Sequence, residues 1–227
     1  MPFAKAVIFD FDGTIADSLE ETAAVYNKVA AELGVSLLHK SDYATIRQMN
    51  PLEVMKYAGV PLRKMPRLMA AVRAGMLERM EFVRPFDGVP EAIRVLRAQG
   101  CRCGILSSNS LENIKRFLQR HDLNAFDLFS CGTSLFGKAT RLRRLVKQIG
   151  LPVTDIYYVG DEVRDVAAAN EVGVRSIAVS WGFSFRDALR EVGPTHIADR
   201  AEQLIDFVGL QRVGTAALAR SVVAHST

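Results

Sequence analysis

The feature that most constrains the fold is an alternation of short apolar runs with amphipathic segments. The first apolar run, residues 5–9 (KAVIF), is almost wholly apolar and predicts a strand that is buried on both faces. After a turn at residues 85–88 (PFDG), four further runs alternate with segments of helical period. Strands that are joined by helical crossovers form a parallel sheet with helices on both faces. The sequence therefore predicts a doubly wound α/β core.

The elements of this core are expected at definite positions. After the first strand, we expect strands at residues 101–106, 126–129, 156–159 and 174–179, with an edge strand at 196–198. Helices are expected at residues 90–99, 111–120, 138–149, 163–172 and 201–208. The core thus takes up residues 1–16 and 85–208, and residues 209–227 form a tail whose sequence is uninformative.

Residues 17–84 show only helical signals and predict an inserted all-helical cap without strands. Apolar side chains recur at helical spacing over residues 19–33, and Gly34 is a suitable residue just beyond a helix end. Pro51 followed by Glu53 is typical of a helix start. We interpret the methionines of this segment as the core of a small helical bundle rather than as a ligand groove. They are Met49, Met55, Met65, Met69, Met76 and Met80.

Composition excludes several classes of protein. A chain of 227 residues with 49% hydrophobic and 24% charged residues is typical of a soluble globular enzyme. No apolar run approaches the ~20 residues that cross a bilayer, so we expect no membrane association. The formal charge of +4 is scattered over predicted helix faces, which argues against nucleic acid as a partner. With three cysteines and no secretory leader, we expect a cytoplasmic protein.

Polar residues follow the predicted strands at the edge where open parallel sheets bind ligands. Together they offer the carboxylates, hydroxyls and ammonium that a magnesium ion and a phosphate require. They are Asp10 and Asp12 after the first strand, Ser107, Ser108 and Asn109 after the second, Lys138 at a helix start, and Asp161 and Asp165 after the fourth strand.

Phosphoryl transfer needs a nucleophile in line with the phosphorus atom and neutralisation of the phosphoryl oxygens. Asp10 fits the nucleophile, provided that a divalent cation shared with Asp161 screens its charge. Asp12 lies close enough to protonate the leaving alkoxide and later to take a proton from water. Thr14 is expected to hold Asp12 or the phosphate by hydrogen bonds. Lys138 can bridge Asp10 and a phosphate oxygen.

Four fragments resemble, in order, the motifs of the haloacid dehalogenase superfamily. They are FDFDGTIADS, ILSSNS, GKATRLRRLVKQ and YVGDEVRD. The fragment PFDGVPEAIRVLRAQG is similar to the segment that re-enters the core in the branch that contains phosphoglycolate phosphatases and β-phosphoglucomutases with a helical cap. The resemblance implies a Rossmann-like core and a magnesium-dependent phosphatase. Its substrate would be a small phosphate monoester, such as phosphoglycolate or a sugar phosphate, which is hydrolysed through an aspartyl-phosphate on Asp10.

The resemblance also implies roles for individual residues. It assigns Mg²⁺ to the side chains of Asp10 and Asp161 and to the backbone carbonyl of Asp12. It assigns phosphate binding to a hydroxyl, for which Ser107 is preferred and Ser108 is the alternative, with Asn109 completing the pocket. Asp165 is a supporting carboxylate that orients Lys138 or the metal's waters. Arg47 lies in a segment that resembles the part of related caps that brings a polar residue towards the substrate. We therefore expect Arg47 to contact the leaving group.

Several alternatives stay open. A sugar phosphomutase uses the same nucleophile and acid but returns the phosphate to a second hydroxyl. A phosphonatase would need a Schiff-base lysine in the cap, where Lys28, Lys40, Lys56 and Lys64 are available. A dehalogenase is disfavoured because Asp12 would have no role. A phospho-accepting signalling module would be shorter and lack a second acid beside the nucleophile. We expect a small phosphorylated molecule as the partner and a monomer or homodimer.

Overall fold

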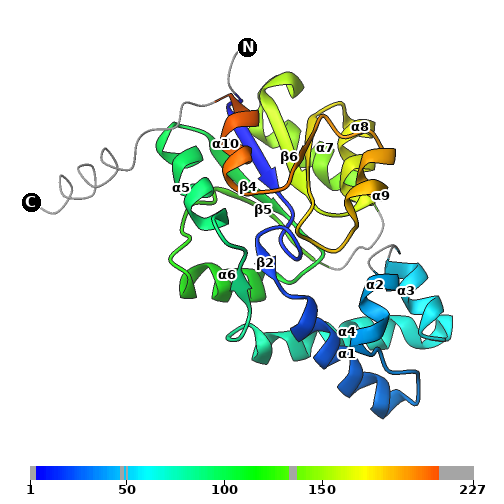
Figure 1. Cartoon of the computed structure of the whole chain (residues 1–227). Helices are drawn as coiled ribbons and strands as arrows, with labels where there is room; N and C mark the ends of the chain where they lie inside the picture. Colours follow the sequence, from blue (N-terminus) through cyan, green and yellow to red (C-terminus); the bar gives the residue numbers. More distant parts are fainter. Residues whose placement is uncertain (1–3, 47–48, 50, 133–136, 210–227) are drawn as a thin grey trace, which may run out of the picture.

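The predicted doubly wound core is confirmed. The computed structural model describes residues 4–46, 49, 51–132 and 137–209. In these ranges six parallel strands form one sheet in the order β5-β4-β1-β6-β7-β8, with helices on both faces (Figure 1). The strands are β1 (Ala6–Phe9), β4 (Arg102–Leu106), β5 (Leu128–Ser130), β6 (Ile156–Gly160), β7 (Arg175–Val179) and β8 (His196–Ala198). The last of them confirms the expected edge strand.

The position of β1 inside the sheet explains why its sequence is apolar at every position. Val7 and Phe9 pack in one cluster with residues of α5 (Val89–Ala98), α6 (Leu111–Arg120) and α10 (Glu202–Val208). Ala6 and Ile8 pack on the other face with residues of α7 (Lys138–Ile149) and α8 (Val163–Val172). Because successive side chains of a strand point to opposite faces, a strand covered on both sides needs apolar residues throughout.

The helices of residues 19–79 lie beyond the carboxyl ends of the sheet strands (Figure 1). We call residues 19–79 the helical region. It contains α1 (Leu19–Leu33), α2 (Tyr43–Ile46), α3 (Pro51–Tyr57), α4 (Met65–Arg79) and the short 3₁₀ turns η1 (Lys40–Asp42) and η2 (Leu62–Lys64). As expected, α1 ends before Gly34, whose left-handed backbone (φ 60°) lets its N–H bond to the carbonyls of Ala30 and Ala31. No helix in the described ranges is long and apolar enough to cross a membrane.

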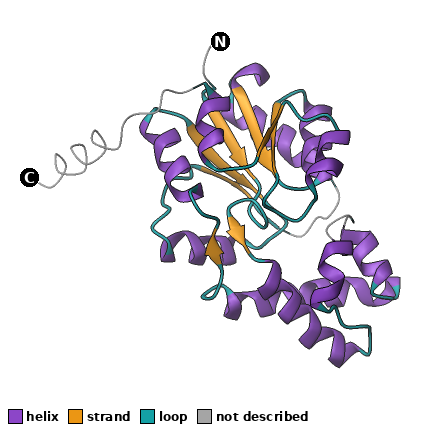
Figure 2. Cartoon of the chain, viewed as in Figure 1, coloured by secondary structure: helices purple, strands orange, loops and turns teal. Residues whose placement is uncertain are grey.

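The expectation that residues 17–84 contain no strand is wrong at both ends of that segment. Strand β2 (Ala16–Asp17) pairs antiparallel with β3 (Arg84–Pro85), between the main sheet and the helical region (Figure 2). Two-residue strands are too short to produce a period in the sequence. The pairing joins the two places where the chain passes between the sheet and the helical region.

Two other elements differ from expectation. The strand expected at 126–129 is shifted to Leu128–Ser130, because Phe126 packs edge-on against Phe9, with ring centroids 6.0 Å apart, instead of joining the ladder. Helix α9 (Arg186–Glu191) was not expected, and among its residues only Leu189 is buried, so it carries almost no periodic signal. A 3₁₀ turn, η3 (Val153–Asp155), precedes β6.

A close approach of α1 and α4 leads to a first prediction. A Cβ atom at Gly75 would lie 2.6 Å from Cγ1 of Val25. Gly75→Ala gains about 1 kcal/mol of helix propensity, but overpacking typically costs about 1–3 kcal/mol. We therefore expect the midpoint of urea unfolding to fall.

The control for this prediction is a double-mutant cycle with Val25→Ala. The smaller residue makes room for the new Cβ, so the alanine at position 75 should be less harmful, or stabilising, in that background. A higher midpoint for Gly75→Ala alone would contradict the close packing of the two helices.

Candidate active site

Asp10 lies at the carboxyl edge of the sheet, in the middle of its width. Phe9, the residue before it, pairs with Ile105 of β4 and with Val159 of β6. The Asp10 N–H continues this ladder by donating to the carbonyl of Val159 at 2.8 Å. Asp10 therefore sits between the ends of the two strands that precede Ser107 and Asp161. Its side chain is buried.

Lys138 follows Asp10 by 128 residues in the sequence and places a positive charge beside its carboxylate. Its Nζ donates to Oδ2 of Asp10 at 2.6 Å and also pairs with Oδ1 of Asp165. Lys138 is the first residue of α7, whose buried Leu142 and Leu145 hold the helix against the sheet. The expectation that Lys138 reaches Asp10 agrees with this geometry, and so does the expectation that Asp165 orients the lysine.

The charges of this pair depend on one another. Burial raises the pKa of Asp10 to about 7, while the Lys138 ammonium opposes that rise. Burial alone would lower the pKa of Lys138, but the Asp10 and Asp165 carboxylates raise it above its usual value. The neighbouring carboxylates therefore favour the protonated, cationic form of Lys138.

Asp12 follows in the loop after β1 and is held by two side chains. Ser18 Oγ donates to its Oδ1 at 2.7 Å, and Asn109 Nδ2 donates to its Oδ2 at 3.0 Å. Burial raises the pKa of Asp12, and these two hydrogen bonds work against the rise. A carboxyl group with a raised pKa suits a proton donor.

Asn109 thus contacts Asp12, a partner that its sequence position did not indicate. Its Oδ1 accepts a hydrogen bond from Asn113 Nδ2 at 2.8 Å, which fixes the orientation of the amide. A direct contact of Asn109 with phosphate stays a prediction.

Asp161 is completely buried after β6, against the loop that holds Gly13. A Cβ atom at Gly13 would lie 2.1 Å from Oδ2 of Asp161, and the left-handed φ of 78° also favours glycine there. Thr14 Oγ1 donates to Oδ1 of Asp161 at 2.7 Å, and the N–H of Phe183 donates to Oδ2 at 2.8 Å. Thr14 was expected to hold either Asp12 or the phosphate. In the structure its hydroxyl holds Asp161 and not Asp12.

The acids at this edge outnumber the cations around them. Burial raises the pKa of Asp161 well above its usual value, and the negative charges of Glu162, Asp165 and Asp10 raise it further. The charges of Lys138 and Arg164 lower the pKa of Asp10 and so oppose the effect of its burial. An excess of buried carboxylates is a donor set that fits a hard divalent cation such as Mg²⁺.

One group of acids has the spacing of metal ligands. Within the described ranges, Asp10, Glu162 and Asp165 each offer a carboxylate oxygen, and these oxygens lie within 4.8 Å of one another. Asp161 is not in this group. The resemblance implies a set of metal ligands that includes Asp161. These distances indicate a different set, which includes Glu162.

The serines after β4 lie at the same edge. Ser107 is buried, its Oγ accepts the N–H of Asn109 at 2.9 Å, and its carbonyl accepts from Arg141 at 2.8 Å. Ser108 lines a cavity instead. The choice of Ser107 as the phosphate hydroxyl stays a prediction. Arg47, the expected contact to the leaving group, lies outside the described residues.

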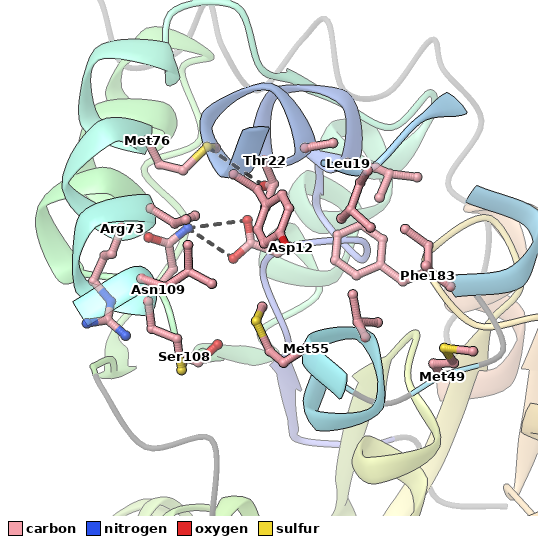
Figure 3. Close-up of a pocket in the computed structure, with 18 of the residues that line it drawn as sticks. Asp12, Leu19, Thr22, Met49, Met55, Arg73, Met76, Ser108, Asn109 and Phe183 are labelled. Atoms are coloured by element: carbon pink, nitrogen blue, oxygen red, sulfur yellow. Dashed lines mark hydrogen bonds between the residues drawn. The ribbon is translucent and has the colours of Figure 1, made fainter. Parts of the chain in front are cut away.

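A cavity of about 280 Å³ opens beside Asp12 and extends into the helical region (Figure 3). The interpretation of the methionines as bundle core is confirmed for Met65, Met76 and Met80, which are buried in the core, and Met55 packs against that core. Met49, Met55, Met69 and Met76 also line the cavity, so core packing is not the full account of these four residues. The bundle is open towards the sheet, so its interior is continuous with the site.

The cavity also contains residues that sequence reasoning missed. Arg73 lies on α4 four residues after Met69 and three before Met76, so its helical spacing could have placed it on the same face. Arg164 donates from Nε to Oε2 of Glu162 at 2.5 Å, a contact that no spacing indicates. Phe183, in the loop after β7, also lines the cavity.

Comparisons with known proteins agree with this geometry. The family model described as haloacid dehalogenase-like hydrolase matches residues 7–179. A phosphoglycolate phosphatase of Synechococcus elongatus is 36% identical over 90% of this chain and 97% of its own length. A phosphoglycolate phosphatase of Xylella fastidiosa is 30% identical over 80% of this chain and 82% of its own length.

The fold agrees with solved structures as well. The crystal structure of a predicted phosphoglycolate phosphatase from Haemophilus somnus has a TM-score of 0.78 and 18% identity, over 91% of this chain and 99% of that one. Because the family model covers most of the chain, including all four motifs, the chain belongs to the haloacid dehalogenase-like hydrolases.

Proposed function

We propose that the protein is a magnesium-dependent phosphatase that hydrolyses a small phosphate monoester through an aspartyl-phosphate on Asp10. The observation that carries the proposal is the buried Asp10 carboxylate, held by Lys138, with Asp12 two residues further on and lining the adjoining cavity. The names of the relatives make phosphoglycolate the first substrate to test.

The reaction has two steps in this proposal. A carboxylate oxygen of Asp10 forms a bond to phosphorus while the bond from phosphorus to the alcohol oxygen breaks, and Asp12 gives that oxygen a proton. Asp12 then takes a proton from water, whose oxygen attacks phosphorus and releases inorganic phosphate from Asp10. Lys138 neutralises negative charge on Asp10 and on the phosphoryl oxygens throughout.

The metal would be held at the acidic edge by the side chains of Asp10 and Asp161 and the backbone carbonyl of Asp12. Bound there, Mg²⁺ supplies the charge neutralisation that lets a carboxylate approach a phosphate. Support comes from Asp161, whose burial among three other acids is unfavourable unless a cation compensates it.

Residues 17–84 act as a cap over residues 1–16 and 85–208 in this proposal. The cavity supports it, since its walls come from α1, α3 and α4 on one side and from the loops after β1, β4 and β6 on the other. A cap that closes over the site excludes water during phosphoryl transfer.

The proposed activity is tested by measuring inorganic phosphate released from phosphoglycolate with Mg²⁺. Wild type should turn over many times, and Asp10→Asn should lose at least ~10³-fold in kcat, because an amide is a poor nucleophile at phosphorus. Sustained release separates a phosphatase from a phosphomutase and from a module that accepts one phosphoryl group. Activity of Asp10→Asn within tenfold of wild type would refute the covalent mechanism.

The role of Asp12 predicts a dependence on the leaving group. In Asp12→Asn, formation of the aspartyl-phosphate should fall least for p-nitrophenyl phosphate, whose leaving group needs no proton, and by roughly 10²–10⁴-fold for an alkyl phosphate. Single-turnover rates with the two esters measure the difference. An equal loss for both would remove Asp12 from proton transfer.

The metal assignment is tested by thermal unfolding, independently of activity. At about 100 times its dissociation constant, Mg²⁺ should raise the Tm by roughly 5–10 °C over a sample with chelator. Asp161→Asn should abolish this rise, and the matched change Glu162→Gln should keep at least half of it. The reverse result would assign the metal to the group of Asp10, Glu162 and Asp165.

A further inference from the structure

The position of the cavity relative to the reacting groups tells which part of a substrate it holds. Its lining includes Asp12, the proposed proton donor to the leaving group, together with Ser108 and Asn109. Asp10, the proposed nucleophile, and Lys138 are not among the lining residues. Since nucleophile and leaving group lie on opposite sides of phosphorus, the cavity is on the leaving-group side.

The lining changes from charged to apolar along the cavity. At the sheet, Asp12, Glu162 and Arg164 contribute charges. Among the described lining residues of the helical region, Arg73 is the one that carries a charge. The remainder of that wall is dominated by aliphatic and methionine side chains, for example those of Ile46, Met55, Leu68, Met69 and Val72. Leu19, Met55 and Met76 of this wall are labelled in Figure 3.

The cavity is larger than a two-carbon acid can fill. A water-sized group takes up about 30 Å³ of liquid, so a cavity of about 280 Å³ holds roughly nine such groups. That is about twice the number of non-hydrogen atoms in glycolate. With glycolate as the leaving group, the apolar part of the cavity would stay largely unfilled, even if Arg73 or Arg164 paired with the glycolate carboxylate. A water-filled apolar cavity is unfavourable, and an apolar group gains free energy by displacing that water.

We propose that the preferred substrates are phosphate monoesters of apolar alcohols, whose chain or ring of up to about eight carbons enters the helical region. The inference rests on the proposed function and names the substrate class of the same site. Flexible, polarisable methionine side chains adapt to chains and rings of different shape, which suits such a pocket. The phosphate stays at the sheet edge, and the apolar part supplies binding energy that orients it.

The experiment compares kcat/KM for ethyl, butyl, hexyl and octyl phosphate with that for phosphoglycolate, by phosphate release with Mg²⁺. We expect a rise of about two- to fourfold per methylene up to hexyl or octyl phosphate, as each carbon leaves water. A flat or falling series overturns the inference, even when phosphate is released. Failure on every ester, phosphoglycolate included, would instead contradict the proposed function.

A variant locates the effect in the cavity. Met69→Gln keeps the size of a half-buried lining residue but places an amide in the apolar wall. It should lower kcat/KM for hexyl phosphate at least tenfold and leave ethyl phosphate within twofold. The matched control is Leu77→Gln, at a half-buried position of the same helix that does not line the cavity, and it should keep the chain-length dependence.

Met55→Gln on α3 gives a second variant of the wall and should reproduce the selective loss on hexyl phosphate. Urea unfolding of each variant shows whether it is folded. Equal losses on ethyl and hexyl phosphate in folded Met69→Gln and Met55→Gln would overturn the inference, because a cavity contact must distinguish the two esters.

Discussion

The ion pair of Lys138 with Asp10 and Asp165 is the interaction on which the rest of the site depends. The Asp10 and Asp165 side chains are buried, that of Lys138 is 11% exposed, and Tyr158 OH donates to Oδ1 of Asp165 at 2.9 Å. Removal of one partner of a buried ion pair typically costs about 3–5 kcal/mol, because the remaining charge is left uncompensated. The ammonium therefore fixes the position of α7 against the sheet and keeps a reactive carboxylate at the end of the central strand.

The two parts of the molecule divide the work in our account. The sheet edge supplies groups for phosphoryl transfer, and each is held by a neighbour: Asp12 by Ser18 and Asn109, and Asp161 by Thr14 and Phe183. The helical region supplies the apolar wall of the cavity. Of these two acids, Asp12 lines that cavity and Asp161 does not. The reaction and the choice of leaving group can thus vary separately, as expected when one fold carries many activities.

Much of the fold and several site residues could be predicted from the sequence. The apolar run of β1 and the helical period of α1 and α7 are local patterns, and the sheet topology brings the residues after β1 and β6 to one edge. The contacts of Asn109 with Asp12 and of Thr14 with Asp161 depend on how distant loops fit together, which no local pattern encodes. For the same reason, the methionines indicated an apolar interior but not that this interior opens on the site. The pairing of β2 with β3 was missed because two residues carry no period.

The central claim, that Asp10 is the nucleophile in its pair with Lys138, is tested most directly by trapping the intermediate. Asp12→Asn protein is mixed with p-nitrophenyl phosphate and Mg²⁺, quenched in acid within milliseconds, digested and examined by mass spectrometry. The account predicts one phosphoryl group on the peptide that contains Asp10, and none when Asp10→Asn is added to the same protein. Release of p-nitrophenol with no phosphorylated peptide, or with the phosphoryl group on another residue, would contradict it.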